Sequence, residues 1–169
     1  MEMESLRHPF TAIYAPDSRI LILGSFPSVK SREQMFFYGH PQNRFWQVMA
    51  ALLGADVPQT VEEKRAFLLA NHIALWDVIA SCDIAGSSDA SIRNAVPNDL
   101  TPILETASIR QIFTNGGTAH RLYRKYIYPL TGREDAVLPS TSPANAARSL
   151  DALIDAWQPV REVLDEEAE

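Results

Sequence analysis

The sequence predicts an α/β fold, a three-layer α/β/α sandwich around a central, mostly parallel four-stranded sheet. Short apolar runs bounded by turn residues are typical of buried strands, and each run is followed by apolar residues at helical spacing. Strands that alternate with helices favour one sheet covered on both faces. The 169 residues suffice for one domain with its own core. We expect a single domain over 1–169, with an N-terminal extension (1–17) and an acidic tail (160–169).

The first strand and helix have the clearest patterns. Residues 20–24, ILILG, form an apolar run that ends in glycine and predicts a buried parallel strand. Residues 44–53 place apolar side chains at i, i+3, i+4 and i+7, which predicts a helix with one buried face. Residues 61–70 also predict a helix, and residues 73–76, IALW, predict a second strand that leads to Asp77.

The second half of the chain continues the alternation. Residues 81–98 are rich in Ser, Asp, Asn and Gly and predict a long surface loop, and a loop of this length is a candidate for function. Ser142 followed by Pro143 is typical of a helix N-cap and first helical position. The remaining expected elements are a helix over 99–106, a strand over 110–114, a helix over 119–126, a strand over 136–139 and a final helix that presents Ala147, Leu150, Ile154 and Trp157 on one face.

The composition, 46% hydrophobic and 21% charged residues, is typical of a soluble globular protein. No apolar run approaches the roughly 18 residues that span a bilayer, and the N-terminus lacks a signal-peptide core. The single cysteine, Cys82, excludes a disulfide framework within the chain and indicates a reducing compartment. We therefore expect an intracellular, cytoplasmic protein without membrane contact.

The net charge of −6 is a weak argument against nucleic-acid binding. Four of the negative residues lie together in 165–169, and such a run is normally solvated. Phosphate contacts need a local basic patch rather than a basic average, so a nucleic-acid partner stays possible. The candidate phosphate contacts, each individually more typical of a solvated charge, are Arg44, Arg121, Arg124, Lys125 and Arg148.

Ligands of open α/β sheets bind beyond the carboxyl ends of the strands. The loops that follow Gly24, Trp76, Thr114 and Pro139 are therefore where chemistry is expected. They contain no GxGxxG or GK[ST] phosphate loop and no GxSxG nucleophile elbow, and the four histidines lack metal spacing. We expect neither a metal nor another cofactor, and chemistry that uses carboxamides, hydroxyls, an aromatic face and backbone amides.

This inventory suits the excision of a base from DNA. A glycosylase holds an extruded base between an aromatic ring and polar groups that read its edge. Cleavage of the N-glycosidic bond develops positive charge on the sugar and negative charge on the base, so the site needs a positioned water and donors aimed at the base.

Three segments carry a resemblance to a known family. GSFPS (24–28) followed by HPQNRFW (40–46) resembles the first signature of the uracil-DNA glycosylase superfamily, and LPSTSPAN (138–145) resembles its second. The order and the ALWDV segment between them are most similar to the hypoxanthine (deoxyinosine) branch, with similarity to the mismatch-specific uracil/thymine branch. The resemblance implies a monofunctional enzyme of base excision repair that acts on damaged DNA, single- or double-stranded, as a monomer.

The resemblance also assigns roles within the first signature. Most branches carry an Asp or Asn that orients the attacking water where this chain has Phe26. The hypoxanthine branch uses an asparagine further along, which indicates Asn43 as the catalytic residue; its alternative role is to cap the helix over 44–53. Tyr38 falls where relatives place a ring under the flipped base, and the alternative is a half-buried tyrosine over the core.

Asp77 lies where relatives often carry the asparagine that reads the base edge. Its carboxylate could accept from N1–H of hypoxanthine, while a backbone amide near Ser25 or Phe26 serves O6. The alternative is a helix N-cap for residues from 78 onward. The residues expected to contact the DNA backbone or to shape the loops around it are Ser28, His40, Asn115, Gly116, Ser140, Ser142 and Asn145.

Three other functions remain open at this point. A uracil or mismatch glycosylase of broad specificity would share every residue named above. A non-catalytic nucleic-acid binding module on the same fold would account for Phe26. A hydrolase that uses Ser140 or Ser142 is disfavoured, because neither serine sits on a nucleophile elbow.

Overall fold

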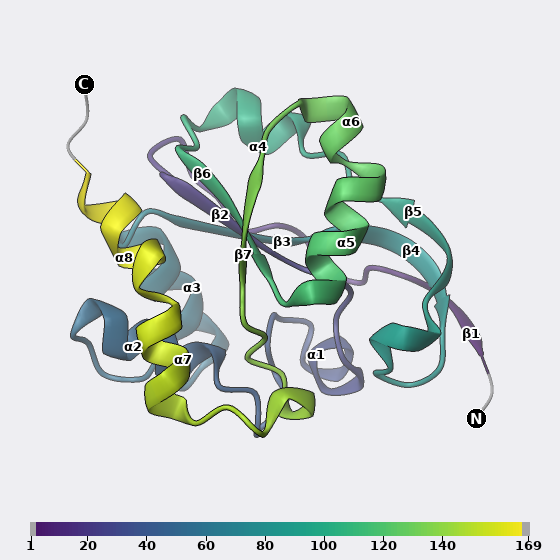
Figure 1. The fold of residues 1–169 in the computed structure, drawn as a ribbon, viewed down its shortest axis with the longest axis horizontal. Coiled ribbons are helices and arrows are strands. Elements are labelled where there is room, and N and C mark those ends of the chain that lie inside the picture. The colour runs from purple at the N-terminus through teal and green to yellow at the C-terminus, as the bar shows by residue number, and fades with distance from the viewer. Residues whose placement is uncertain (1–2, 167–169) are drawn as a thin grey trace.

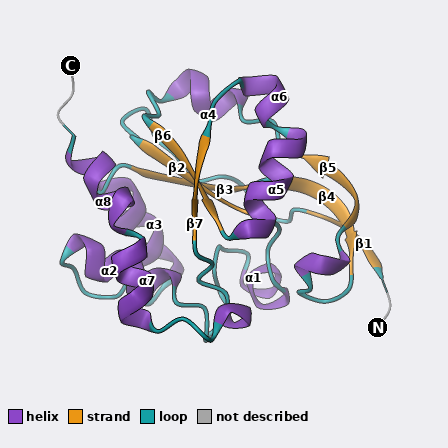
Figure 2. Cartoon of the chain, in the orientation of Figure 1, coloured by secondary structure: helices purple, strands orange, loops and turns teal. Residues whose placement is uncertain are grey.

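The computed structural model describes residues 3–166, and its central sheet has four parallel strands in the order β3-β2-β6-β7 (Figures 1 and 2). The strands are β2 (Ile20–Gly24), β3 (Ile73–Asp77), β6 (Gln111–Asn115) and β7 (Asp135–Leu138). Each lies within one residue of its predicted range. Helices cover both faces of the sheet, which confirms the predicted three-layer α/β/α fold.

Eight helices and two short 3-10 turns lie within the described residues. Their bounds are α1 (Val29–Gln34), α2 (Phe45–Leu53), α3 (Val61–Ala70), η1 (Asp89–Ser91), α4 (Thr101–Thr106), α5 (Gly117–Tyr126), α6 (Tyr128–Thr131), η2 (Pro143–Asn145), α7 (Leu150–Ala156) and α8 (Gln158–Asp165). The helices expected over 44–53, 61–70, 99–106 and 119–126 are confirmed as α2, α3, α4 and α5.

Alternate side chains of β2 point to two separate cores. Ile20 and Ile22 join the core under α2, α3, α7 and α8, whereas Leu21 and Leu23 join the core under α4 and α5. Successive side chains of a strand point to opposite faces of its sheet, so a strand buried on both faces must be apolar throughout. This explains the uninterrupted ILIL run, all of whose residues are fully buried.

The expected surface loop over 81–98 is wrong. Half of it belongs to β4 (Ile79–Ile84) and β5 (Arg93–Pro97), which pair antiparallel in a second sheet of order β1-β4-β5. The alternation of apolar and polar residues that marks a strand is weak here, because β5 is mostly exposed and the β4–β5 pairing has two register shifts. Strand β1 (Glu4–Arg7) comes from the expected N-terminal extension and pairs with β4.

The final helix is divided rather than continuous. Ser142 caps only the 3-10 turn η2, and Ser149 caps α7, which ends before Trp157. Pro159 then lies in the first turn of α8, where its missing N–H leaves no bond unmade. Helix α8 runs to Asp165 through most of the expected acidic tail, and residues 167–169 lie outside the described residues.

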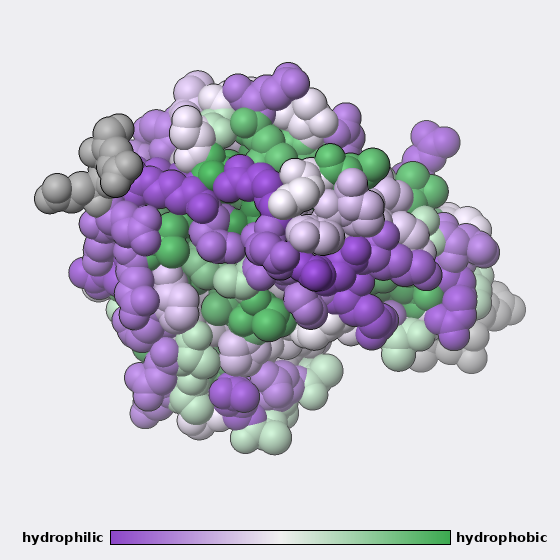
Figure 3. All heavy atoms as spheres, turned by 45° about the horizontal axis from the view of Figure 1, so that its top comes forward, coloured by the Kyte–Doolittle hydropathy of each residue, from purple (hydrophilic) through white to green (hydrophobic). Residues whose placement is uncertain are grey.

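Polar residues cover most of the face shown in Figure 3, and apolar residues appear there as separate small patches. Within residues 3–166, no helix combines the length and the apolar character needed to cross a membrane.

Candidate active site

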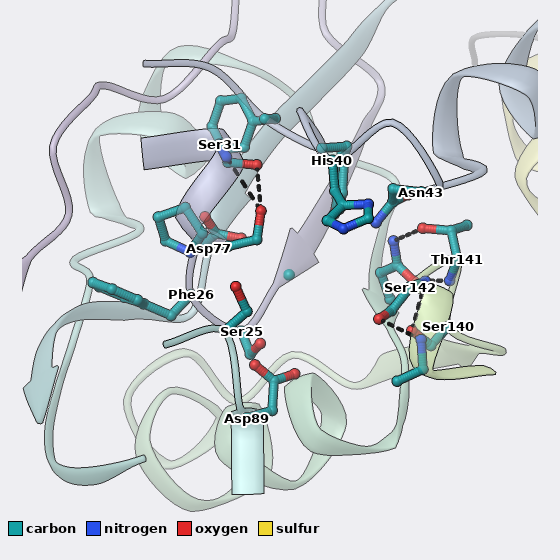
Figure 4. A pocket seen from close by; sticks show the side chains of 18 of the residues that line it. Ser25, Phe26, Ser31, His40, Asn43, Asp77, Asp89, Ser140, Thr141 and Ser142 are labelled. Atoms are coloured by element: carbon teal, nitrogen blue, oxygen red, sulfur yellow. Dashed lines mark hydrogen bonds between the residues drawn. The ribbon is translucent and has the colours of Figure 1, made fainter. Parts of the chain in front are cut away.

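The loops at the carboxyl ends of the parallel strands enclose a pocket of about 310 Å³. The chain steps from β2 to β3 on one side and then crosses to β6 on the other, so the pocket lies where the strand order reverses. Figure 4 shows two groups of side chains that face each other across it. The predicted site residues that line it are Ser25, Phe26, Ser28, Tyr38, His40, Asn43, Asp77, Asn115, Ser140 and Ser142.

A second hollow adjoins the first and contains the two remaining predicted residues. It measures about 410 Å³ and includes Gly116 and Asn145, together with Arg148. Asn115, Ser140 and Ser142 line both hollows. The structure therefore brings every predicted site residue to one continuous surface.

Gly24 and Asp77 form the floor of the pocket. They are register partners at the ends of β2 and β3, and the Asp77 side chain is almost fully buried. A Cβ atom on Gly24 would lie 2.4 Å from Asp77 Oδ1 and 3.2 Å from the Tyr38 hydroxyl. Glycine is required here because the carboxylate and the hydroxyl occupy the space that any side chain would need.

Asp77 is not a helix N-cap, so that alternative is wrong: strand β4 begins at Ile79. The Asp77 carbonyl accepts from Asn98 Nδ2 at 2.8 Å, and its Oδ2 lies 2.7 Å from His8 Nε2. Oδ1 accepts no hydrogen bond within residues 3–166. One oxygen of a nearly buried carboxylate is therefore held by the protein while the other is left for a ligand.

Tyr38 presents a ring and a hydroxyl to the site. Its ring stacks on Phe45 with centroids 4.1 Å apart and planes at 20°. Its backbone has a left-handed φ of 52°. The hydroxyl is buried and has no hydrogen-bond partner in the described part of the chain. Burial raises the pKa of Tyr38, and the nearby Asp77 charge raises it further, so the hydroxyl keeps its proton and can donate to a ligand.

Phe26 and Ser28 have structural contacts besides their places in the pocket wall. The Phe26 side chain is buried in the core under α4 and α5, and the Arg32 guanidinium lies 5.9 Å from its ring centroid. Ser28 caps α1, since its hydroxyl accepts from the Ser31 N–H at 3.2 Å. Phe26 offers no hydrogen bond to a water, as expected from the sequence.

The N-cap residue of α2 is Arg44 rather than Asn43, but the Asn43 side chain does bond the first N–H of the helix. Its Oδ1 accepts from the Phe45 N–H at 3.0 Å, which fixes the carboxamide and leaves its Nδ2 without a partner in residues 3–166. His40 stabilises the same turn, since its Nδ1 accepts from the Gln42 N–H at 3.0 Å. Both side chains lie at the pocket (Figure 4), so the bond to the Phe45 N–H holds Asn43 in place without removing it from the site.

Arg44 joins the two signature segments. Its guanidinium donates to the carbonyls of Arg148 and Asn145, and its N–H donates to the Thr141 carbonyl. Asn115 completes the joint, because Nδ2 donates to Thr141 Oγ1 at 3.0 Å and Oδ1 accepts from the Thr141 N–H at 3.1 Å. The side chains of Arg44 and Asn115 are therefore committed to holding the loops together.

The loop over 138–145 also has its own hydrogen bonds. Ser140 Oγ accepts from the Ser142 N–H at 3.0 Å, and Asn145 Nδ2 donates to the Ser140 carbonyl at 2.9 Å. Gly116 has φ of 100°, and a Cβ there would meet Ser140 at 3.0 Å, so glycine permits this close approach.

Sequence reasoning missed several residues at the site, among them His8, Thr141 and Asp89. His8 lies in the expected extension, and Thr141 is a buried residue inside the second signature. Asp89 comes from η1, in the segment singled out as a candidate functional loop, but nothing in the sequence marked this carboxylate. Burial raises the pKa of Asp89, a hydrogen bond from Ser25 lowers it and the Asp77 charge raises it, so the net shift is upward.

Most of the chain, residues 11–162, matches the family model described as "Uracil DNA glycosylase superfamily". The chain belongs to the uracil DNA glycosylase superfamily. It is 34% identical to a protein of Methanosarcina acetivorans named "Hypoxanthine DNA glycosylase", over 83% of this chain and 89% of that one. A Methanosarcina barkeri protein of the same name is 30% identical, over 88% and 93%.

A solved structure of the superfamily has the same fold. The solution NMR structure of a candidate uracil DNA glycosylase from Methanosarcina acetivorans matches with a TM-score of 0.80 and 32% identity, over 98% of this chain and all of that one. The superfamily predicted from the two signatures is thus confirmed. In residues 3–166, no three His, Cys, Asp or Glu side chains cluster as metal ligands.

Gly24→Ala should lower the free energy of unfolding by about 1–3 kcal/mol, because the new methyl group overlaps Asp77 Oδ1. Urea titration measures this loss. The matched control is Gly117→Ala, whose Cβ meets nothing within 4 Å; it should be neutral or stabilise by about 0.4–1 kcal/mol. Equal effects of the two substitutions would contradict the steric role of Gly24.

The raised pKa of Asp89 predicts how stability depends on pH. The folded protein keeps this proton to higher pH than the unfolded chain, so Asp89 lowers stability as pH rises from the ordinary aspartate pKa of about 3.9 to its raised value. Asp89→Asn cannot ionise. Its free energy of unfolding should therefore rise relative to wild type as pH increases above the ordinary aspartate pKa of about 3.9, measured by urea titration at each pH.

The control for Asp89 is Asp83, whose pKa is shifted the other way. Hydrogen bonds from Ser5 and Asn94 lower the pKa of this exposed carboxyl, so its contribution is present at neutral pH and is lost as pH falls. Asp83→Asn should lose stability relative to wild type as pH rises. The same trend for both variants would refute the assignment for Asp89.

Proposed function

We propose that this protein is a monofunctional DNA glycosylase that binds a flipped-out, deaminated base and hydrolyses its N-glycosidic bond, with hypoxanthine as the preferred base. The observation that carries the proposal is Asp77, a nearly buried carboxylate with one oxygen free to accept from a ligand in the pocket. Two relatives over most of the chain bear the name hypoxanthine DNA glycosylase, which supports the same substrate.

The edge of hypoxanthine complements Asp77. Deamination of adenine replaces an acceptor nitrogen at N1 by an N1–H donor and an amino group by the O6 acceptor. Asp77 Oδ1 accepts from N1–H, and a backbone amide near Ser25 or Phe26 donates to O6. Adenine would instead present the N1 lone pair to the carboxylate, and the unpaired buried charge would disfavour its binding.

Tyr38 and Asn43 supply the aromatic face and the catalytic carboxamide. The Tyr38 ring, backed by Phe45, stacks on the base, a contact worth about 1–3 kcal/mol. Asn43 positions the attacking water at the sugar, and its bond to the Phe45 N–H holds it in one orientation. Positive charge that develops on the sugar is stabilised by such oriented dipoles in a pocket that excludes bulk water.

The serine-rich loops grip the DNA backbone in this proposal. Hydroxyl and backbone N–H groups at short helices and turns suit phosphate oxygens. Arg148 lines the second hollow and is the cation placed to reach a phosphate there. The residues assigned to the backbone are Ser28, His40, Gly116, Ser140, Ser142 and Asn145, with Asn115 fixing the loop. The enzyme acts as a monomer inside the cell, without a cofactor.

Uracil is the second candidate substrate. Its N3–H is also a donor that a carboxylate can accept, and the solved relative is a candidate uracil DNA glycosylase. A broad uracil or mismatch activity would therefore use the same pocket. The relative rates of hypoxanthine and uracil excision distinguish the two candidate functions.

The purified protein should release hypoxanthine from inosine-containing oligonucleotides faster than uracil or xanthine from matched strands. Alkali converts each abasic product into a strand break that a gel resolves. Single- and double-stranded forms of each substrate belong in the panel. Uracil as the fastest substrate would shift the assignment to the second candidate, and DNA binding without excision of any base would leave a binding module on this fold.

Asn43→Ala should reduce the single-turnover rate of excision by about 100-fold or more, the scale of a lost electrostatic group in an active site. Asn43→Asp keeps an oxygen that can accept from the Phe45 N–H, so its thermal midpoint should stay close to that of wild type. Near-normal turnover by Asn43→Ala, with its thermal midpoint unchanged, would assign the catalytic role to another residue.

A further inference from the structure

His8 lies against Asp77 although it precedes residue 11, where the family match begins. Its Nε2 is 2.7 Å from Asp77 Oδ2, and the two side chains are 3% and 5% exposed. The pairing of β1 with β4 delivers His8 to this position, and the His8 N–H donates to the Ala80 carbonyl at 2.7 Å. The second sheet thus adds a side chain to the floor of the site.

Aromatic rings surround the His8 imidazole. Phe10 and Trp76 lie with centroids at 4.5 Å, Phe26 at 5.9 Å and Phe37 at 6.1 Å. The other ring nitrogen, Nδ1, is buried and has no partner within residues 3–166. A buried N–H without an acceptor is rare and costly. The tautomer that fits carries its proton on Nε2, where Asp77 accepts it.

We propose that His8 is a positioning residue: its Nε2–H donates to Asp77 Oδ2 and turns Oδ1 toward the pocket as the acceptor for the N–H on the base edge. The inference rests on the proposed function, in which Asp77 reads that edge. Gly24 supports the same orientation, because the missing Cβ leaves the space that Oδ1 occupies.

The arrangement makes Asp77 an acceptor and nothing else. A carboxylate that receives a proton donor on one oxygen presents only lone pairs on the other. Hypoxanthine offers an N–H at that edge and adenine does not, so His8 would act on specificity through Asp77. In metal sites, mutating a residue that hydrogen-bonds and orients a metal ligand typically lowers activity by about 10- to 100-fold. We expect a loss of the same size when the residue that orients Asp77 is removed.

A double-mutant cycle tests whether His8 acts through Asp77. His8→Leu should slow single-turnover excision of hypoxanthine by about 10- to 100-fold. In the Asp77→Asn background, His8→Leu should change the single-turnover rate by no more than about twofold, because the carboxylate that His8 orients is no longer present. His8→Gln, which keeps an N–H donor near the Nε2 position, should recover most of the rate. Equal losses in both backgrounds, or a glutamine no better than leucine, would overturn the proposal.

His120→Leu is the matched control. His120 also bonds an aspartate, with Nδ1 2.6 Å from Asp135 Oδ2, but it does not line the pocket. Its excision rate should match wild type. If His8→Leu fails to fold, His8→Gln and His8→Asn replace it, because the shorter asparagine cannot place its donor at Nε2; equal rates for these two would also refute the role.

A measurement that needs no activity separates this inference from the proposed function. The ring ¹⁵N spectrum of His8 should show Nε2–H with a bare Nδ1 at neutral pH, and the Nε2 signal should move in Asp77→Asn. A ring protonated on Nδ1, alone or together with Nε2, would overturn the positioning role. Wild-type protein that excises no base would refute the proposed function, while this spectrum would still decide the hydrogen bond.

Discussion

The position of β2 in the middle of a parallel sheet is the constraint on which the site depends. This strand is buried along its whole length and pairs with β3 on one side and β6 on the other. Because parallel strands end at the same edge, Gly24, Asp77 and Asn115 come together there although they are far apart in the sequence. The absence of a side chain at Gly24 then leaves space for both the Asp77 carboxylate and the Tyr38 hydroxyl.

The loops beyond this edge are held by hydrogen bonds between segments that the sequence separates. Arg44 lies in the first signature and donates to backbone carbonyls of the second, and Asn115 clamps Thr141 from β6. Buried polar groups that are fully paired in this way make loops rigid. Catalytic geometry must be held to a fraction of an ångström, so these side chains serve the site without reaching its ligand.

The groups that lack partners mark the other half of the design. The Tyr38 hydroxyl is a buried group without a hydrogen-bond partner in residues 3–166. One oxygen of Asp77 and the Asn43 Nδ2 are also left unbonded at the pocket by the described residues. Asp89, whose pKa is raised by burial, lies in the same pocket. Buried polar groups are normally satisfied, and titratable groups with raised pKa values in one pocket, here Tyr38 and Asp89, are typical of a functional site.

The sequence by itself determined the superfamily, the parallel sheet and most pocket residues. Strands buried on both faces must be apolar, and the two signatures are contiguous segments, so both are legible locally. Only the tertiary structure decided that half of residues 81–98 lie in strands, and that the Asn43 side chain bonds the first N–H of α2 as well as lining the site. It also decided that Asp89 lines the pocket and that His8 lies against Asp77 at its floor. Exposed, irregular strands carry little alternation, and contacts as distant in sequence as that of His8 with Asp77 leave no local pattern.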